Sequence, residues 1–161
     1  MTAIGANAVV NASNKIRLGN SSVTVLESQV GLTVVSDKNA KENFRPVNAE
    51  GVLKKVAGLT VPSWNYIGHD PKDFRHYGPM AQDFFAAFGD DEFGRIGSPT
   101  TINSSDMSGI LMLAVQALEK RSSDLQNDND VLRSENKTLE EKMQTQEERI
   151  RRLEEALILT H

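Results

Sequence analysis

The sequence predicts an α+β protein in three zones: a short β-stranded segment at residues 1–35, a small mixed globular domain at residues 36–110, and a long C-terminal helix at residues 111–161. Three observations support this division. Apolar residues alternate with polar ones in the first zone, aromatic residues gather in the second, and apolar residues recur in heptads along the third. We therefore expect one small domain with fibrous attachments.

Composition and charge exclude several classes of protein. The hydrophobic fraction of 39% excludes wholesale disorder, and the net charge of −4 gives no reason to expect a nucleic-acid or membrane partner. With no cysteine, the chain has no disulfide, thiolate zinc site or cysteine nucleophile. No apolar run approaches the ~20 residues that span a bilayer. The first residues lack the basic start of a secretory signal.

The first zone has the pattern of short strands. Residues 15–18 and 22–25 alternate with period two, each near a Gly or Asn turn signal. Ile4 and Leu18, each followed by glycine, are 14 residues apart, as expected for stacked β-repeats of a fibre shaft. So short a segment cannot bury its own faces. It needs a longer parent chain or identical neighbours.

The middle zone carries the aromatic residues of a small core. We expect a helix at 48–56 ended by Gly58, a strand around 64–67 followed by a turn at 69–71, and a helix at 80–88. About 75 residues is near the lower limit for an independently stable core, so oligomerisation would help. The aromatic residues assigned to this core are Trp64, Tyr66, Phe84, Phe85 and Phe88.

The third zone has the strongest physical signal, an unbroken heptad repeat. With Val115 at position a, nine of the thirteen a and d positions as far as Leu157 are apolar, which predicts a coiled coil. We refer to the nine apolar positions, together with the two asparagines at a positions, as the seam. The seam residues are Val115, Leu118, Leu125, Asn129, Leu132, Asn136, Leu139, Met143, Ile150, Leu153 and Leu157.

Flanking charges favour a parallel arrangement of the helices. The g-to-e′ pair Glu135–Glu140 repels, but three other pairs attract. Asn129 and Asn136 at a positions weaken the seam but penalise alternative alignments, which suits a device that aligns chains. The attracting pairs are Asp128–Arg133, Lys142–Glu147 and Arg149–Glu154.

The stretch SDKNAKEN, residues 36–43, places a hydroxyl and a primary amine five residues apart at the boundary of the middle zone. A serine hydroxyl becomes a strong nucleophile when a neighbouring base takes its proton, and a lysine can be that base. Fully extended, five residues span roughly 17 Å, so Ser36 and Lys41 meet only if the chain winds between them. Asp37 and Asn39 favour such a turn. The segment is either a catalytic dyad or a solvated linker.

Four blocks of residues form a pattern along the chain. They are Ser36-Asp37 with Lys41-Glu42-Asn43, then Tyr66, then Gly78-Pro79-Met80-Ala81-Gln82-Asp83, and finally Ala114-Val115-Gln116-Ala117-Leu118. In this order and spacing the blocks resemble the C-terminal intramolecular chaperone domain of phage endosialidases, tailspikes and tail fibres. The resemblance covers residues 36–158, with departures from the family pattern at Asn39, Pro79 and Asp83.

The resemblance implies a homotrimeric chaperone that aligns three chains of a fibre and is then released by autoproteolysis. It assigns Ser36 as nucleophile and Lys41 as base, with Asp37, Asn39 and Asn43 in support, and with Val35–Ser36 cut in preference to Ser36–Asp37. The partners would be two further copies and the upstream fibre of the parent chain, with no cofactor. The implied location is a virion tail fibre or tailspike folded in the host cytoplasm, from which the chaperone is absent once cleaved.

The residues give less support to two other interpretations, a metal site and a DNA-binding zipper. His69, Asp70, Asp73 and His76 invite a metal site, but Pro71 interrupts any helix that could gather them, so we expect none. A DNA-binding zipper fails because the segment before the heptads is poor in basic residues. Two alternatives to the self-cleaving chaperone stay open: an uncleaved, permanent fibre tip, and a coiled-coil scaffold or adhesin segment with no chemistry.

Overall fold

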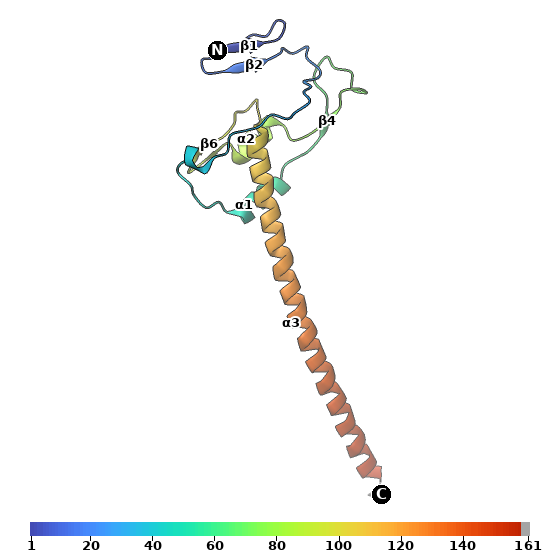
Figure 1. Ribbon diagram of the computed structural model, residues 1–161. Helices are drawn as coiled ribbons and strands as arrows, with labels where there is room; N and C mark the ends of the chain where they lie inside the picture. The colour runs from blue at the N-terminus through green and yellow to red at the C-terminus, as the bar shows by residue number, and fades with distance from the viewer. Residues whose placement is uncertain (159–161) are drawn as a thin grey trace.

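The computed structural model describes residues 1–158 and shows a mixed α/β molecule built around one long helix (Figure 1). The last three residues of the helix expected at 111–161 lie outside the described part. In chain order the elements are β1 (Thr2–Ile4), β2 (Ile16–Leu18), the 3₁₀ helix η1 (Lys38–Ala40), α1 (Ala49–Ala57), β3 (Ser63–Trp64), β4 (His76–Tyr77), α2 (Ala81–Phe88), β5 (Asp90–Asp91), β6 (Gly94–Arg95) and α3 (Ser104–Ile158).

The first zone contains one parallel strand pair, β1 with β2. Ile4 lies opposite Leu18, so the register offset equals the 14-residue spacing seen in the sequence. The amide of Gly19 donates to the carbonyl of Ile4 at 2.8 Å as the chain leaves the ladder. The second expected strand, at residues 22–25, is wrong: these residues are not a strand in the structure. They have no neighbouring strand to pair with, and alternation alone does not supply one.

Two short antiparallel hairpins complete the β structure, β3 with β4 and β5 with β6. The strand expected around residues 64–67 is shorter and earlier, at Ser63–Trp64. Gly68, with φ of +88°, lies in a turn in which the His69 amide donates to the Tyr66 carbonyl at 3.0 Å. This turn begins before the expected one and ends the strand early.

Both short helices lie where the sequence predicts them, and a glycine ends each one. The Asn48 side chain accepts a hydrogen bond from the Gly51 amide at 3.0 Å at the start of α1, and Gly58 ends the helix. Gly89 ends α2, and a Cβ added there would collide with the ring and carbonyl of Phe85. The helices predicted at 48–56 and 80–88 are therefore confirmed.

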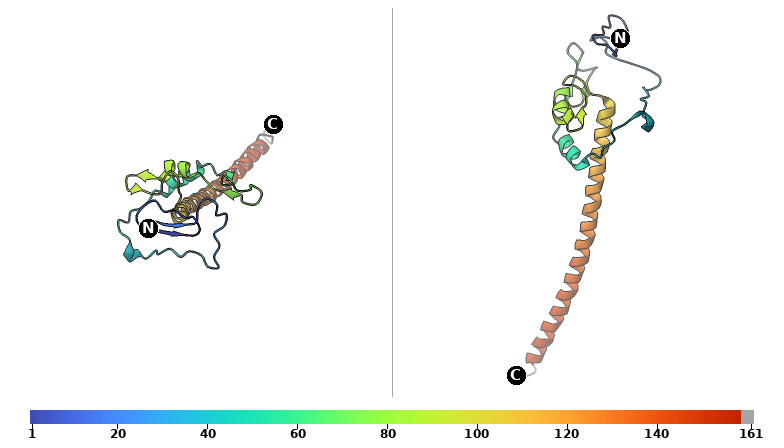
Figure 2. Two further views of the ribbon diagram at one scale, coloured as in Figure 1. Left: turned by 90° about the horizontal axis from the view of Figure 1, so that it is seen from above. Right: turned by 90° about the vertical axis from the view of Figure 1, so that its left-hand side faces the viewer.

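The core lies where α1 and α2 meet the first turns of α3 (Figure 2). Val52 packs with Phe84, Phe88 and Ile110, and a second cluster joins α1 to α3. The expected domain boundary between residues 110 and 111 thus falls inside α3. That second cluster consists of Leu53, Ala114 and Ala117.

Three aromatic residues assigned to the core from the sequence, Trp64, Tyr66 and Phe85, lie outside its two clusters, and Phe85 is half-buried on α2. The side chain of Tyr66 is 59% exposed, and Trp64 is half-buried on the β3–β4 hairpin. They stack edge to face on each other, and Trp64 also stacks on His76. The assignment of Tyr66 to the core is wrong because its hairpin projects from the helices instead of packing between them.

Helix α3 has two different faces in its first turns. Ile110, Ala114 and Ala117 face α1 and are buried. Val115 and Leu118, which begin the seam, are 63% and 52% exposed. The globular domain therefore occupies one side of α3 and leaves the seam side uncovered.

An ion pair joins the first turn of α1 to α3. Arg121 donates from Nε to Glu50 Oε2 at 3.0 Å and from Nη2 to Oε1. The hydrogen bond from Arg121 is the main cause of the lowered pKa of Glu50, whose ordinary value is 4.5, and the charges of Arg121 and Lys54 lower that pKa further. This bidentate contact fixes the start of α1 against α3.

Within residues 1–158, no helix combines the length and the apolar character that crossing a membrane requires.

We predict that Phe84→Ala destabilises the chain by about 3–5 kcal/mol, because it empties the most buried side-chain position of a small core. Chemical denaturation followed by circular dichroism measures the loss. Phe44→Ala is the matched control, since Phe44 is 63% exposed and its removal should change stability by no more than about 0.5 kcal/mol. Equal losses for the two variants would contradict the core described above.

We also predict that Glu50→Gln lowers the melting temperature at neutral pH and has little effect in acid. Because the folded chain lowers the pKa of Glu50, the pair stabilises the fold above about pH 4.5 and loses that effect as pH falls through the lowered pKa. The measurement is the difference in melting temperature between parent and variant from pH 7 to pH 3. Glu92→Gln, at an exposed turn, is the control, and a difference that does not vary with pH would refute the role of the pair.

Candidate active site

The site begins with a single turn of 3₁₀ helix whose cap is built into the sequence. Asp37 Oδ1 accepts hydrogen bonds from the Asn39 amide at 2.9 Å and from Asn39 Nδ2 at 3.1 Å. The backbone closes the turn with bonds from Ala40 to Asp37 and from Lys41 to Lys38, both 3.2 Å. An aspartate at this position favours such turns because its oxygen replaces a backbone acceptor.

The turn brings together the two residues assigned to the dyad. Lys41 Nζ donates a hydrogen bond to Ser36 Oγ at 2.7 Å. Five extended residues would hold the two groups far apart, so the 3₁₀ turn of Lys38–Ala40 is what makes this contact. This geometry places an amine and a hydroxyl within proton-transfer distance on one short segment.

Both side chains of the pair are open to solvent in the single chain. Ser36 and Lys41 are exposed, and Val35, the residue before the serine, is 80% exposed. In this hydrogen bond the lysine donates to the serine. To act as a base, the lysine must be neutral and accept the serine proton instead. In general, burial lowers the pKa of a lysine amine and favours that neutral form. The single chain supplies the contact without the burial.

The segment after the turn is attached to the β5–β6 hairpin. Asn43 has φ of +57°, a left-handed conformation that asparagine tolerates better than most residues. The guanidinium of Arg45 lies 5.2 Å from the centre of the Phe93 ring, a cation–π contact. Asn43, Arg45 and Phe93 line a shallow hollow. Sequence reasoning missed Arg45 and Phe93, since no local pattern joins residues so far apart.

The metal interpretation finds no geometry to support it. His69 packs against the rings of Tyr66 and Phe74, and His76 against Trp64 and Tyr66. In the part of the chain that the structure describes, no three His, Asp or Glu side chains gather as metal ligands would. The two histidines belong to the aromatic cluster of the β3–β4 hairpin.

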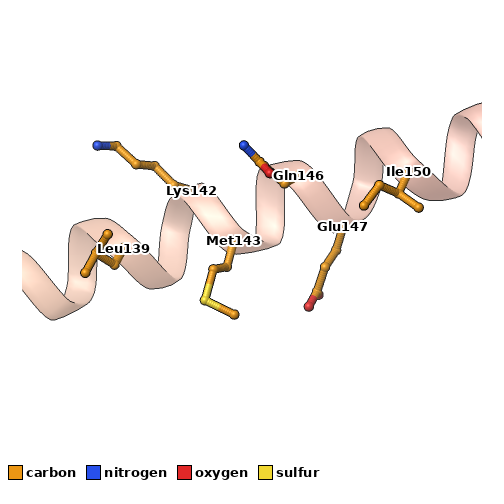
Figure 3. Close-up of a pocket in the computed structure, with 6 residues that line it drawn as sticks. All are labelled: Leu139, Lys142, Met143, Gln146, Glu147 and Ile150. Atoms are coloured by element: carbon orange, nitrogen blue, oxygen red, sulfur yellow. The ribbon is translucent and has the colours of Figure 1, made fainter.

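The seam is a second candidate functional surface. Its apolar members are half or more exposed, from Val115 at 63% to Leu157 at 67%. Figure 3 shows one stretch of it, a shallow hollow on a single helix lined by Leu139, Lys142, Met143, Gln146, Glu147 and Ile150. These are a, d, e and g positions of the heptad, the set that a coiled-coil partner contacts. The Asn129 side chain donates to the Leu125 carbonyl of its own helix at 2.8 Å.

Two of the three remaining resemblance blocks contribute to the helices that form the core, while Tyr66 is exposed between β3 and β4. Residues 78–83 lead into and start α2, where Met80 is the N-cap. Residues 114–118 lie on α3, where Ala114 and Ala117 pack on α1 and Val115 and Leu118 begin the seam. Two blocks thus build the scaffold, while the first block forms the Ser36–Lys41 contact.

Comparison with known families agrees with these motifs. Residues 36–91 match the family described as the chaperone of endosialidase, a peptidase family. The match starts at Ser36 itself and includes η1, α1 and α2. A search of curated proteins finds no match. The description of that family names a chaperone, and its classification names a peptidase. This match covers 56 of the 161 residues, so the finding is a likeness of the middle segment to the chaperone of endosialidase.

Proposed function

We propose that this chain is an intramolecular chaperone that trimerises, aligns three copies of a phage tail fibre or tailspike, and is released by one autoproteolytic cut. The observation that carries the proposal is the 2.7 Å hydrogen bond between Lys41 Nζ and Ser36 Oγ. This bond lies at the first residue of the family match. A linker has no need of such a contact, whereas a self-cleaving site requires it.

Trimerisation is supported by the division of α3 into two faces. The domain core uses Ile110, Ala114 and Ala117, and leaves the exposed seam for other copies. A row of apolar side chains over more than five heptads is too extensive to remain in water, since each buried CH₂ is worth about 0.8 kcal/mol. Three identical helices in parallel would bury it while keeping their three globular domains outside.

The proposed reaction is an attack by Ser36 on the carbonyl carbon of the residue before it. Lys41, neutral, takes the hydroxyl proton as Ser36 Oγ bonds to the Val35 carbonyl carbon. The bond from that carbon to the Ser36 nitrogen then breaks, and the lysine returns the proton to this nitrogen. An ester joins Val35 to Ser36 Oγ, and water hydrolyses it. The products are a carboxylate at Val35 and a new amino terminus at Ser36.

Assembly would supply what the single chain lacks. The dyad is solvent-exposed in one chain, and neighbouring domains in a trimer would cover it. Cleavage would then follow correct alignment, because only the assembled particle shields the lysine from water. The cut would leave the aligned fibre behind, its persistence governed by slow unfolding and not by the continued presence of the chaperone.

The runner-up is the same module kept as a permanent, uncleaved fibre tip. The exposure of Ser36 and Lys41 favours it for any state in which no neighbour covers the dyad. A scaffold or adhesin segment without chemistry would use the same exposed seam, but it would give no role to the contact between Ser36 and Lys41. Whether the chain cleaves itself distinguishes the released chaperone from the permanent fibre tip.

We predict that the parent chain, attached to more of its upstream fibre, yields fragments divided between residues 35 and 36. Ser36→Ala and Lys41→Ala each abolish this cut and preserve trimers, because neither side chain lies on the seam. Lys41→Arg fails as well, since a guanidinium stays protonated and cannot accept the serine proton. Intact mass spectrometry measures the products and distinguishes division at Val35–Ser36 from division at Ser36–Asp37.

Lys38→Ala is the matched control, because it removes another exposed lysine of the same turn and should cleave at the parental rate. A Lys41→Arg variant that cuts as fast as the parent would remove Lys41 as the base. Fragments that form equally in Ser36→Ala would identify a contaminating protease as the cause.

We predict that the Ser36→Ala chain is a trimer in solution, with three times the 17.7 kDa of one chain. Light scattering at micromolar concentration measures the mass. Leu132→Asp should dissociate the trimer, because it places a charge at a d position. Val131→Asp, at the neighbouring residue, should not; the two side chains are 55% and 56% exposed in one chain, but only Leu132 is on the seam.

A monomer or dimer of the Ser36→Ala chain would refute the trimer. Equal dissociation by Leu132→Asp and Val131→Asp would refute the assignment of the seam. Truncation after Arg121, which removes most of the seam, should leave a soluble but loosely folded fragment with poor association. A stable, cooperative trimer from that fragment would show that α3 is not the assembly element.

A further inference from the structure

The β1–β2 ladder is a repeat of 14 residues. Ile16 and Leu18 lie opposite Thr2 and Ile4, and a glycine with positive φ follows each strand, at Gly5 and Gly19. A Cβ added to Gly5 would lie 3.4 Å from the Gly19 Cα, so successive repeats stack closely at this corner. The Asn20 side chain also donates across the repeat to the Ala6 carbonyl at 2.9 Å.

A third segment, residues 30–32, follows β2 at the same 14-residue spacing and is not paired with a strand in the structure. Val30 and Leu32 fall 14 residues after Ile16 and Leu18, and the two connecting segments, residues 5–15 and 19–29, have equal length. Val30 is 76% exposed and Leu32 is 94% exposed. Within the described chain, the edge of β2 away from β1 has no strand partner.

We propose that residues 30–32 form a third strand, parallel to β2 of the same chain, with Val30 opposite Ile16 and Leu32 opposite Leu18. This strand satisfies the free backbone groups along the β2 edge. Because side chains two apart point to one face, Val30 and Leu32 join the apolar face that already carries Ile16 and Leu18. The inference extends beyond the trimeric chaperone and does not depend on cleavage.

The repeat ends after this strand for a local reason. Thr33 stands where Gly5 and Gly19 stood, and a threonine does not readily adopt the positive φ of those glycines. The chain therefore leaves the repeat after Leu32 and reaches the Val35–Ser36 bond within three residues. A cut at that bond would leave the shaft with a complete third strand.

Paired cysteines in the full-length chain test the register, because the protein has no cysteine of its own. Register partners on neighbouring strands have Cα atoms about 4.8 Å apart, within the range of about 4.4–6.8 Å found in disulfides. We expect Leu18→Cys with Leu32→Cys to close a disulfide within one chain under mild oxidation. Non-reducing electrophoresis and peptide mapping identify it.

Two matched pairs make the outcome decisive. Ile4→Cys with Leu18→Cys reports the strand pair already seen and should close to a similar extent. Leu18→Cys with Val34→Cys uses the same face but lies two residues out of register, beyond the about 7 Å that a disulfide can bridge, and should stay reduced. The proposal is overturned if the pair 18 and 32 closes no more than the pair 18 and 34, or if it joins two different chains. Failure of the pair 4 and 18 to close would overturn the 14-residue repeat itself.

Discussion

The packing of α1 on one side of α3 is the constraint on which the rest of the molecule depends. Small residues at Ala114 and Ala117 let α1 approach closely, and Arg121 holds the start of α1 through Glu50. Because this contact uses one side of α3 only, the helix contributes to a domain core and leaves its seam side exposed for the proposed assembly. A larger residue at either alanine would push α1 away and disturb both roles together.

The Ser36–Lys41 contact depends on far less structure. A single 3₁₀ turn, capped by Asp37, positions it, and both side chains of the pair are exposed. A tertiary attachment close to it in the chain is the stacking of Arg45 on Phe93 of the β5–β6 hairpin. The geometry of the contact is thus encoded locally, whereas in the proposed function its shielding from water comes from other chains. Under that proposal, the contact can form before the chains assemble.

Local features could be predicted from the sequence, and long-range ones could not. The caps at Asn48, Gly58 and Gly89, the long heptad helix and the turn between Ser36 and Lys41 depend on neighbouring residues, and each is found in the structure. The strand expected at residues 22–25 and the burial expected for Tyr66 were wrong because each depends on a partner that sequence pattern does not name.

The contacts that sequence reasoning missed share a single cause. Glu50 with Arg121, and Arg45 with Phe93, join residues that the fold alone brings together. The 14-residue ladder is the exception among long-range features, because its repetition leaves a trace in the sequence. That ladder closes within one chain, so it forms in the same way however neighbouring chains are aligned. In the proposed trimer, a slip of one helix against the next would instead be penalised by the asparagines of its seam, Asn129 and Asn136.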